Sequence, residues 1–296
     1  MSIFLRRIIL ALLGLSGGLL CWPVQEILLG LQVYFPDFLL FSLLAGGIFG
    51  LIFGAFFASA EGIIAARWNR VFQGMGWGAL IGALGGTLGF LLAQGVFFWV
   101  GEQWALTGER VTWLGLPLTR ALGWGVLGAF VGSAEGFRVL SLQKLWVGLV
   151  GGLVGGSLGG AVLEYLKVLF PDFSLGPLVG LAVFGILLGI AYGFVEKSLS
   201  FGVLRLLNGR LKGKEFILNQ RKLVLGTGAK SDILLTGYRD VAGDLAQLQV
   251  QGRELSIISL TKTPSVLVND EPVEQRILKY EDVIKIGSAK LYYKHE

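Results

Sequence analysis

The chain has 296 residues, of which 54% are hydrophobic and 15% charged, and its mean hydropathy is +0.70. Soluble domains carry about 25% charged residues, so a chain that is soluble along its whole length is excluded. With one cysteine and one histidine, zinc sites, Cys–His nucleophile pairs and Ser–His–Asp triads are nearly excluded. We therefore expect no enzyme, no metal and no cofactor.

The charge and the glycine content divide the chain into two parts. Residues 1–196 hold nine Lys/Arg and nine Asp/Glu, so residues 197–296 carry the whole net charge of +5. The first 200 residues contain 37 of the 46 glycines. The basic residues follow the last apolar run, where anionic lipid headgroups are the ordinary partner, so we expect membrane lipid and no nucleic acid as a partner.

The first part contains six apolar runs, and a membrane-spanning helix needs about 20 such residues. This pattern predicts an α-helical polytopic membrane bundle over residues 1–196. The runs cover residues 8–30, 38–60, 74–100, 118–134, 146–166 and 174–195.

Internal repeats indicate that the six runs are three copies of one helical hairpin. GAFFASAEG at 54–62 recurs as GAFVGSAEG at 128–136, and FPDF at 35–38 recurs at 170–173. Each copy ends in small residues followed by a glutamate. A second match pairs Gly78 with Gly148 and continues through the neighbouring glycines at the same offset of 70.

Connecting segments with many and with few positively charged residues alternate along the chain. This pattern predicts the orientation of the protein in the membrane, because cytoplasmic loops are enriched in Lys and Arg. The sparse side has only Arg110, Arg120 and Lys167. We predict a multi-pass protein of the inner (plasma) membrane with both termini cytoplasmic. The rich side holds Arg6, Arg7, Arg67, Arg70, Arg138, Lys144, Lys197, Arg205, Arg210, Lys212 and Lys214.

Two glycine stripes at four-residue spacing predict close helix packing, because small residues let backbones approach in lipid. An alternative is a narrow pore or a seam between copies of the chain, which would make the protein a homo-oligomer. The stripes are Gly78, Gly82 and Gly86 in one run and Gly148, Gly152 and Gly156 in another.

Glu61, Glu135 and Glu196 are the most suggestive polar residues in this part, since a carboxylate within hydrocarbon is costly and usually functional. Each ends its run and is followed closely by basic residues. We expect ion-paired carboxylates at the membrane interface. A cation or proton site with pseudo-threefold symmetry is the alternative.

The second part begins with residues 197–214, whose apolar residues at helical spacing predict a basic amphipathic linker helix on the inner leaflet. From 215 to 296 the pattern changes to short β-branched runs separated by Gly, Asp, Asn and Pro, which predicts a small all-β sandwich or barrel. The expected core members are Ile217, Leu223, Leu225, Ile233, Leu235, Leu248, Val250, Ile257, Ile258, Val268, Ile277, Ile284, Ile286 and Leu291.

Several runs in this region resemble the framework of a forkhead-associated (FHA) domain, a β-sandwich that in most members binds phosphothreonine peptides. They are KLVLG ending at Gly226, SDILL at 231–235, AQLQVQGRELSII, VLVND at 266–270 and YEDVIKIG at 280–287. The resemblance covers residues 215–294 and does not include the membrane part.

The residues that bind phosphopeptide in the family do not carry over. Thr227 stands where the family places an arginine, and residues 242–245 replace its serine-arginine-x-histidine loop. Pro264, Ser265 and Val266 replace its asparagine-glycine-threonine loop. Arg239 is the one nearby basic substitute, and we interpret it as a solvated loop residue.

These features favour an integral membrane scaffold that presents a phosphate-independent FHA-like module to another protein at the cytoplasmic face. The resemblance implies a role like that of adaptors in signalling and secretion assemblies. The alternative is a subunit of an oligomeric membrane pore or transporter that the FHA-like domain regulates.

Overall fold

The computed structural model describes residues 3–65, 67–104, 111–209, 211–228, 231–251, 254–261 and 266–294. These residues form two compact units, one of which is Arg6–Glu196 and the other mainly Lys197–Glu296. Among residues named above, Arg110, Arg210, Pro264 and Ser265 lie outside the described ranges, as does the single histidine, His295.

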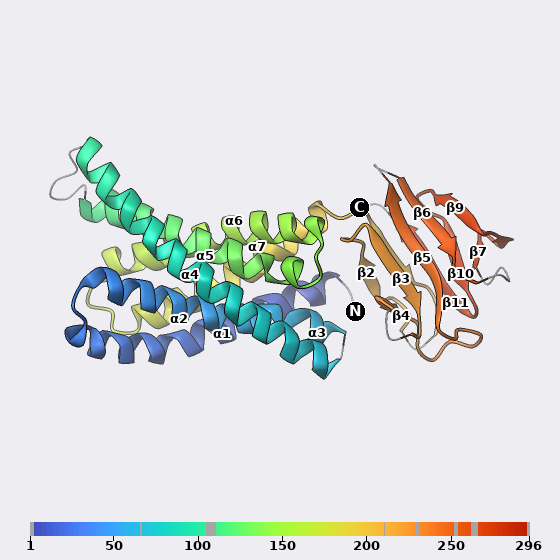
Figure 1. The fold of residues 1–296 in the computed structure, drawn as a ribbon, viewed down its shortest axis with the longest axis horizontal. Helices are drawn as coiled ribbons and strands as arrows, with labels where there is room; N and C mark the ends of the chain where they lie inside the picture. The colour runs from blue at the N-terminus through green and yellow to red at the C-terminus, as the bar shows by residue number, and fades with distance from the viewer. Residues whose placement is uncertain are drawn as a thin grey trace. The chain divides into compact units, whose positions relative to one another are not determined.

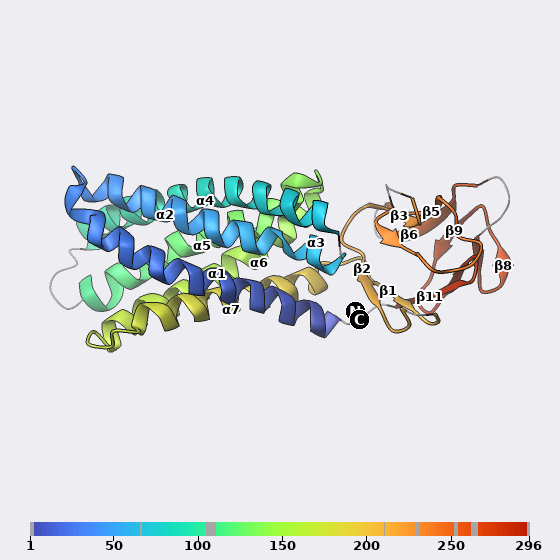
Figure 2. The same cartoon turned by 90° about the horizontal axis from the view of Figure 1, so that it is seen from below.

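Helices make up the first unit (Figures 1 and 2). Six helical segments of the described chain are long and apolar enough to cross a membrane, which confirms the prediction of six long apolar helices. The elements are α1 (Ile3–Leu31), η1 (Gln32–Tyr34), α2 (Phe38–Ala58), α3 (Ala60–Ile64), α4 (Trp68–Trp104), η2 (Val111–Gly115), α5 (Leu116–Arg138), α6 (Leu142–Leu169) and α7 (Gly176–Ser198).

Several helix pairs pack backbone against backbone at glycines, among them α2 with α4, α5 with α6, and α7 with α1. A Cβ atom on Gly82 would overlap the carbonyl oxygen of Gly50, and one on Gly152 would overlap that of Gly128. On α7, a Cβ on Gly185 would overlap the carbonyl oxygen of Gly14. All six glycines of the two predicted stripes make such contacts, namely Gly78, Gly82 and Gly86 against α2 and Gly148, Gly152 and Gly156 against α5.

These contacts relate the α2–α4 pair to the α5–α6 pair by an offset of 74 residues. The substituent on Gly62 would meet Val71, and that on Gly136 would meet Leu145. The sequence match of Gly78 with Gly148 at offset 70 is therefore displaced by one helical turn. Glycines that recur every four residues allow such a shift in an alignment, and only the packing partner fixes the equivalence.

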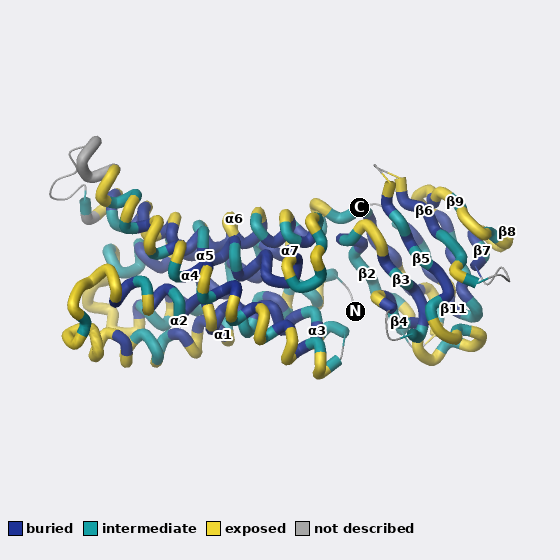
Figure 3. The backbone as a smooth tube through the Cα atoms, in the orientation of Figure 1, coloured by how far each residue is buried: buried dark blue, intermediate teal, exposed yellow. Residues whose placement is uncertain are grey.

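Strands form the second unit, in two sheets. Their orders are β2-β1-β11-β10-β7-β8 and β4-β3-β5-β6-β9, so the predicted β-sandwich is confirmed. Buried residues occur along the helices and along the strands of both sheets (Figure 3). The strands are β1 (Val203–Leu206), β2 (Glu215–Ile217), β3 (Lys222–Gly226), β4 (Ile233–Leu234), β5 (Asp244–Gln251), β6 (Glu254–Ser259), β7 (Val266–Val268), β8 (Glu271–Pro272), β9 (Gln275–Leu278), β10 (Val283–Ile286) and β11 (Ala289–Lys294).

The predicted linker helix over 197–214 is wrong beyond Ser198. Helix α7 ends at Ser198, and Gly202 then has φ +128°, which an α-helix does not adopt. Val203–Leu206 form β1 between β2 and β11. Leu204 and Leu206 are fully buried. Pairing with two strands gives the backbone of β1 its hydrogen bonds, and this tertiary contact overrides the local helical pattern.

The expected core members lie mostly inside the sandwich, but Ile277 is 53% exposed. It belongs to β9, which is an edge strand of its sheet. The outer face of the sheet is open to solvent, and the alternation along β9 places the neighbouring Leu278 in the core instead.

Candidate functional site

One end of the helical bundle gathers the three predicted glutamates. Arg6 of α1 forms a bidentate ion pair with Glu196 of α7, with its Nε 2.7 Å from Oε2 and its Nη2 2.8 Å from Oε1. The same Nη2 also donates to Glu61 of α3. The Glu196 side chain is 1% exposed and that of Glu61 is 25% exposed. One guanidinium therefore joins two of the three repeated carboxylates.

The third carboxylate, Glu135 of α5, has its own cations. Arg138 donates to it from Nε at 2.7 Å, and the Lys144 ammonium lies 4.0 Å away. Glu135 and Glu61 line the same small cavity of about 10 Å³, together with Tyr192. This cavity is about the size of one water molecule. The cluster thus contains three carboxylates and three cations within the membrane unit, as buried charges require.

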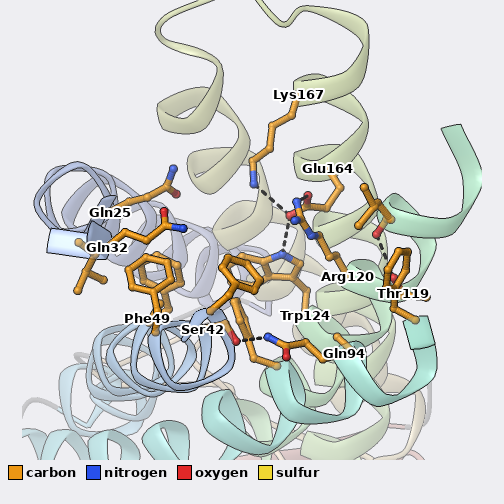
Figure 4. A pocket seen from close by; sticks show the side chains of 18 of the residues that line it. Gln25, Gln32, Ser42, Phe49, Gln94, Thr119, Arg120, Trp124, Glu164 and Lys167 are labelled. Carbon is orange, nitrogen blue, oxygen red and sulfur yellow. Dashed lines mark hydrogen bonds and ion pairs between the residues drawn. The ribbon is translucent and has the colours of Figure 1, made fainter. Parts of the chain in front are cut away.

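The opposite end of the bundle has a larger pocket of about 380 Å³ between α1, α2, α4, α5 and α6 (Figure 4). Phenylalanines form much of its wall, and amide and hydroxyl side chains project from several helices. Gln94 donates to Ser42 across it. Small-molecule sites in proteins have about 300–1,000 Å³ and the same mixture of apolar walls and a few polar groups.

Glu164 of α6 is the centre of the polar part of this pocket. Its carboxylate accepts from Arg120 Nη1 at 3.2 Å, from Trp124 Nε1 at 3.2 Å and from Lys167 Nζ at 3.1 Å. Glu164 is only 4% exposed. Sequence reasoning placed Arg120 and Lys167 among the outer charges and missed Glu164, although an acidic residue three positions before a lysine inside an apolar run was a usable signal.

An aromatic layer lies at Trp124, which also lines the pocket. Trp124 stacks on Phe49 with ring centroids 5.8 Å apart and contacts Phe184 at 4.8 Å. Phe184 in turn contacts Phe53 at 4.9 Å, and both are almost fully buried. Large side chains thus fill the bundle interior beyond the pocket.

In the second unit, the positions that correspond to phosphopeptide-binding residues are occupied by internal contacts. Thr227 Oγ1 accepts from the Gly243 amide at 3.0 Å and donates to the Val241 carbonyl at 3.4 Å. The Asp244 carboxylate accepts from Ser231 at 2.6 Å. Arg239 is exposed, and its backbone N–H and C=O bond Ser288.

Comparison with known proteins concerns this same unit. The family model described as the cytoplasmic domain of an inner membrane component of T3SS matches residues 205–296. The match begins inside β1 and covers the strands from β2 onward. The C-terminal module is FHA-like. No curated protein sequence matches the chain.

Three of the similar solved structures each match about a third of this chain. A domain from a study of phosphothreonine-dependent FHA interactions is 22% identical, with 32% of this chain and 95% of that chain covered and a TM-score of 0.29. An FHA domain from Chlamydia trachomatis is 19% identical, with 32% and 96% covered and a TM-score of 0.30. The cytoplasmic domain of the T3SS sorting platform protein PscD from P. aeruginosa is 17% identical, with 31% and 77% covered and a TM-score of 0.28.

Among the described residues, no group of three or more His, Cys, Asp or Glu side chains has an arrangement suited to a metal ion. The two buried carboxylate clusters are held by Arg and Lys instead. Their chemistry is that of paired charges, and the pocket beside Glu164 has space for a ligand of small-molecule size.

Proposed function

We propose that the protein is an inner-membrane scaffold that presents its FHA-like module at the cytoplasmic face and binds another protein through it without requiring phosphate. The membrane unit anchors the module. The family model supports this role, because its description names a cytoplasmic domain of an inner membrane component.

The observation that carries phosphate independence is the use of Thr227. Its hydroxyl bonds the loop at Gly243 and Val241, so the position corresponding to the family's arginine stabilises a loop and offers no positive charge. The Asp244 carboxylate nearby would repel a phosphate. Hydrogen bonds to charged groups contribute about 1.5–3 kcal/mol each, so losing two lowers affinity about 100-fold or more.

The direct test is titration of the full-length protein in mild detergent with phosphothreonine peptide pools and their unphosphorylated counterparts. We expect no phosphate-dependent binding. The Arg239→Gln variant is titrated in parallel because Arg239 is the nearby basic substitute. Binding that disappears on dephosphorylation, and in Arg239→Gln, would contradict the proposal and give the module a phosphopeptide-reading role.

The partner itself is sought by crosslinking in intact membranes, followed by purification of the full chain. A stoichiometric protein that is lost when the module's exposed loops are substituted supports the scaffold. Unchanged recovery of the partner protein after the loop substitutions would contradict the scaffold. Purification of the chain without any partner would contradict it as well.

Orientation is tested with reporters. A reporter that is active only in the cytoplasm should be active when fused after Glu296. A reporter that is active only outside the cytoplasm should be active when inserted at Asp172, between α6 and α7. The reverse pattern would invert the topology and place the module on the wrong side for a cytoplasmic partner.

Transport by an oligomer is the second candidate, supported by charged groups at both ends of the bundle. The buried side chains of Phe53, Leu127 and Phe184 fill the interior between those ends. A path for ions or solutes would therefore run between copies of the chain. Solute flux into proteoliposomes that hold the purified chain alone would favour this candidate over the scaffold.

A further inference from the structure

The pocket at the Glu164 end of the bundle is too large and too apolar to remain empty in a membrane. Its volume is about 380 Å³, and its walls include Phe38, Phe41, Phe49, Phe90, Phe97 and Phe98. Water is a poor occupant of such walls, because each buried water needs two to four polar partners. Acyl chains, in contrast, surround the bundle on every side.

The rim of the pocket is accessible from outside the helices. Leu29 is 49% exposed, Phe38 is 55% exposed and Phe98 is 67% exposed, and these come from α1, α2 and α4. A chain from the surrounding lipid can therefore reach the phenylalanines laterally. The stacked Trp124 and Phe49 rings close the floor of the pocket. The pocket is therefore a blind cavity and does not form a path through the bundle.

The polar side of the pocket carries a surplus of positive charge. Arg120 and Lys167 share one carboxylate, Glu164, and their side chains are 45% and 34% exposed. Arg120 uses Nη1 for this pair, so further N–H donors of both cations have no partner among the described residues. Such donors suit phosphate or carboxylate oxygens.

Two uncommitted amides lie across the pocket from these charges. The side-chain amides of Gln25 and Gln32 line the pocket and make no hydrogen bond with any described residue. Figure 4 shows both on the side of the pocket across from Glu164 and Lys167. Polar side chains around an enclosed apolar space are the arrangement that fixes the head of an amphiphile.

The depth of these charges along the helices matches a lipid headgroup. Lys167 is in the last turn of α6, and Arg120 is near the start of α5. Cationic side chains near span ends lie at the membrane–water interface. Of the phenylalanines in the pocket, Phe49 and Phe90 lie near the middle of α2 and α4, further from that interface. The polar and apolar parts of the pocket are thus ordered as in a phospholipid.

We propose that this pocket binds one anionic amphiphile, with its phosphate headgroup on Arg120 and Lys167 and its acyl chain against the phenylalanine wall. The site is separate from the FHA-like module and from the proposed protein partner. Its function would be to make the membrane unit sensitive to anionic lipid.

The experiment uses delipidated full-length protein in mild detergent, with phosphatidylglycerol, phosphatidylcholine of the same acyl chains, and inorganic phosphate as separate probes. Native mass spectrometry counts bound molecules, and the shift in melting temperature gives relative affinity. We expect one tightly held phosphatidylglycerol, weaker retention of phosphatidylcholine and no stabilisation by inorganic phosphate alone.

Two variants test the two halves of the pocket. Arg120→Gln with Lys167→Gln should weaken phosphatidylglycerol binding about 10-fold or more, because charge-assisted hydrogen bonds are lost. Leu29→Trp keeps every charge but places a larger side chain at the pocket, and it should also reduce retention. Arg67→Gln removes one positive charge at the opposite end of the bundle and serves as the control with unchanged binding.

Three results would overturn the proposal. One is equal retention of phosphatidylglycerol by the parent, by Leu29→Trp and by the double glutamine variant. Another is equal binding of phosphatidylcholine and phosphatidylglycerol by the parent. The third is stabilisation by inorganic phosphate as large as that by the lipid, which would leave the apolar wall without a role.

Discussion

Arg6 and Glu196 are separated by 190 positions in the sequence, yet they form a bidentate ion pair with N–O distances of 2.7 and 2.8 Å. The pair joins the beginning of the first membrane helix to the end of the last. The glycine contacts between α1 and α7, at Gly14 and Gly185, continue the same seam. The last membrane helix therefore packs against the first, and both ends of the membrane unit lie at the same end of the bundle.

Arg6→Gln should destabilise the membrane unit by about 3–5 kcal/mol, because it leaves two carboxylates without their shared cation. Glu196 is 1% exposed and cannot recover hydration in place. The measurement is thermal unfolding of the full-length protein in detergent. Arg67→Gln is the control, and Arg6→Gln combined with Glu196→Gln should be less damaging than Arg6→Gln alone. Equal melting of Arg6→Gln and the parent would show that the pair is not needed.

Gly82→Leu should prevent close packing of α2 and α4, since even a Cβ atom there would overlap the Gly50 carbonyl. Gly76→Leu is the matched control on the same helix, because a Cβ at Gly76 meets nothing within 4 Å. We expect Gly82→Leu to aggregate or to melt far below the parent in detergent, and Gly76→Leu to resemble the parent. If both variants melt alike, the Gly78, Gly82 and Gly86 stripe does not serve tight helix packing. That result would favour the alternative of a narrow pore or a seam between copies of the chain.

Strand β1 should be essential to the FHA-like module. Leu204→Ala removes a fully buried side chain and should cost about 2–5 kcal/mol, whereas Leu207→Ala, at a position 36% exposed, should cost far less. Denaturant unfolding of a 197–296 fragment measures both. A fragment of 212–296 lacks β1 and should not fold cooperatively. A stable 212–296 fragment would support the domain boundary at residue 215 that the sequence predicts.

Alkaline pH should destabilise the module through Tyr293. Burial, with a smaller effect of Tyr280, raises the pKa of Tyr293 above its ordinary value of 10.0, and its hydroxyl donates to the Phe201 carbonyl at 2.9 Å. Folding therefore favours the neutral phenol. Its contribution is present below the ordinary pKa and is lost as pH rises above it toward the raised pKa.

The measurement for Tyr293 is the free energy of unfolding of the module between neutral pH and about pH 11, a window that spans the ordinary phenol pKa. Tyr293→Phe should flatten the alkaline decline, and Tyr292→Phe on the same strand is the control. The same decline in all three proteins would remove Tyr293 as its cause.

The sequence by itself determined the features that depend on local composition and periodicity. Six apolar runs were long enough to span, and the change to short β-branched runs after residue 214 marked a second unit. The framework residues around Gly226 and Gly287 identified the FHA-like module. These features can be predicted without tertiary information, because the hydrophobicity of a run and the alternation along a strand are properties of the sequence itself.

Tertiary structure decided the features that depend on a partner far away in the chain. Residues 203–206 form a strand because β2 and β11 flank them, although their local pattern is helical. The equivalence of Gly78 with Gly152 follows from which carbonyl each glycine meets. Glu164 becomes the centre of a pocket only when α5 brings Arg120 and Trp124 to it. Burial and ion pairing depend on distances between segments, and no single segment contains those distances.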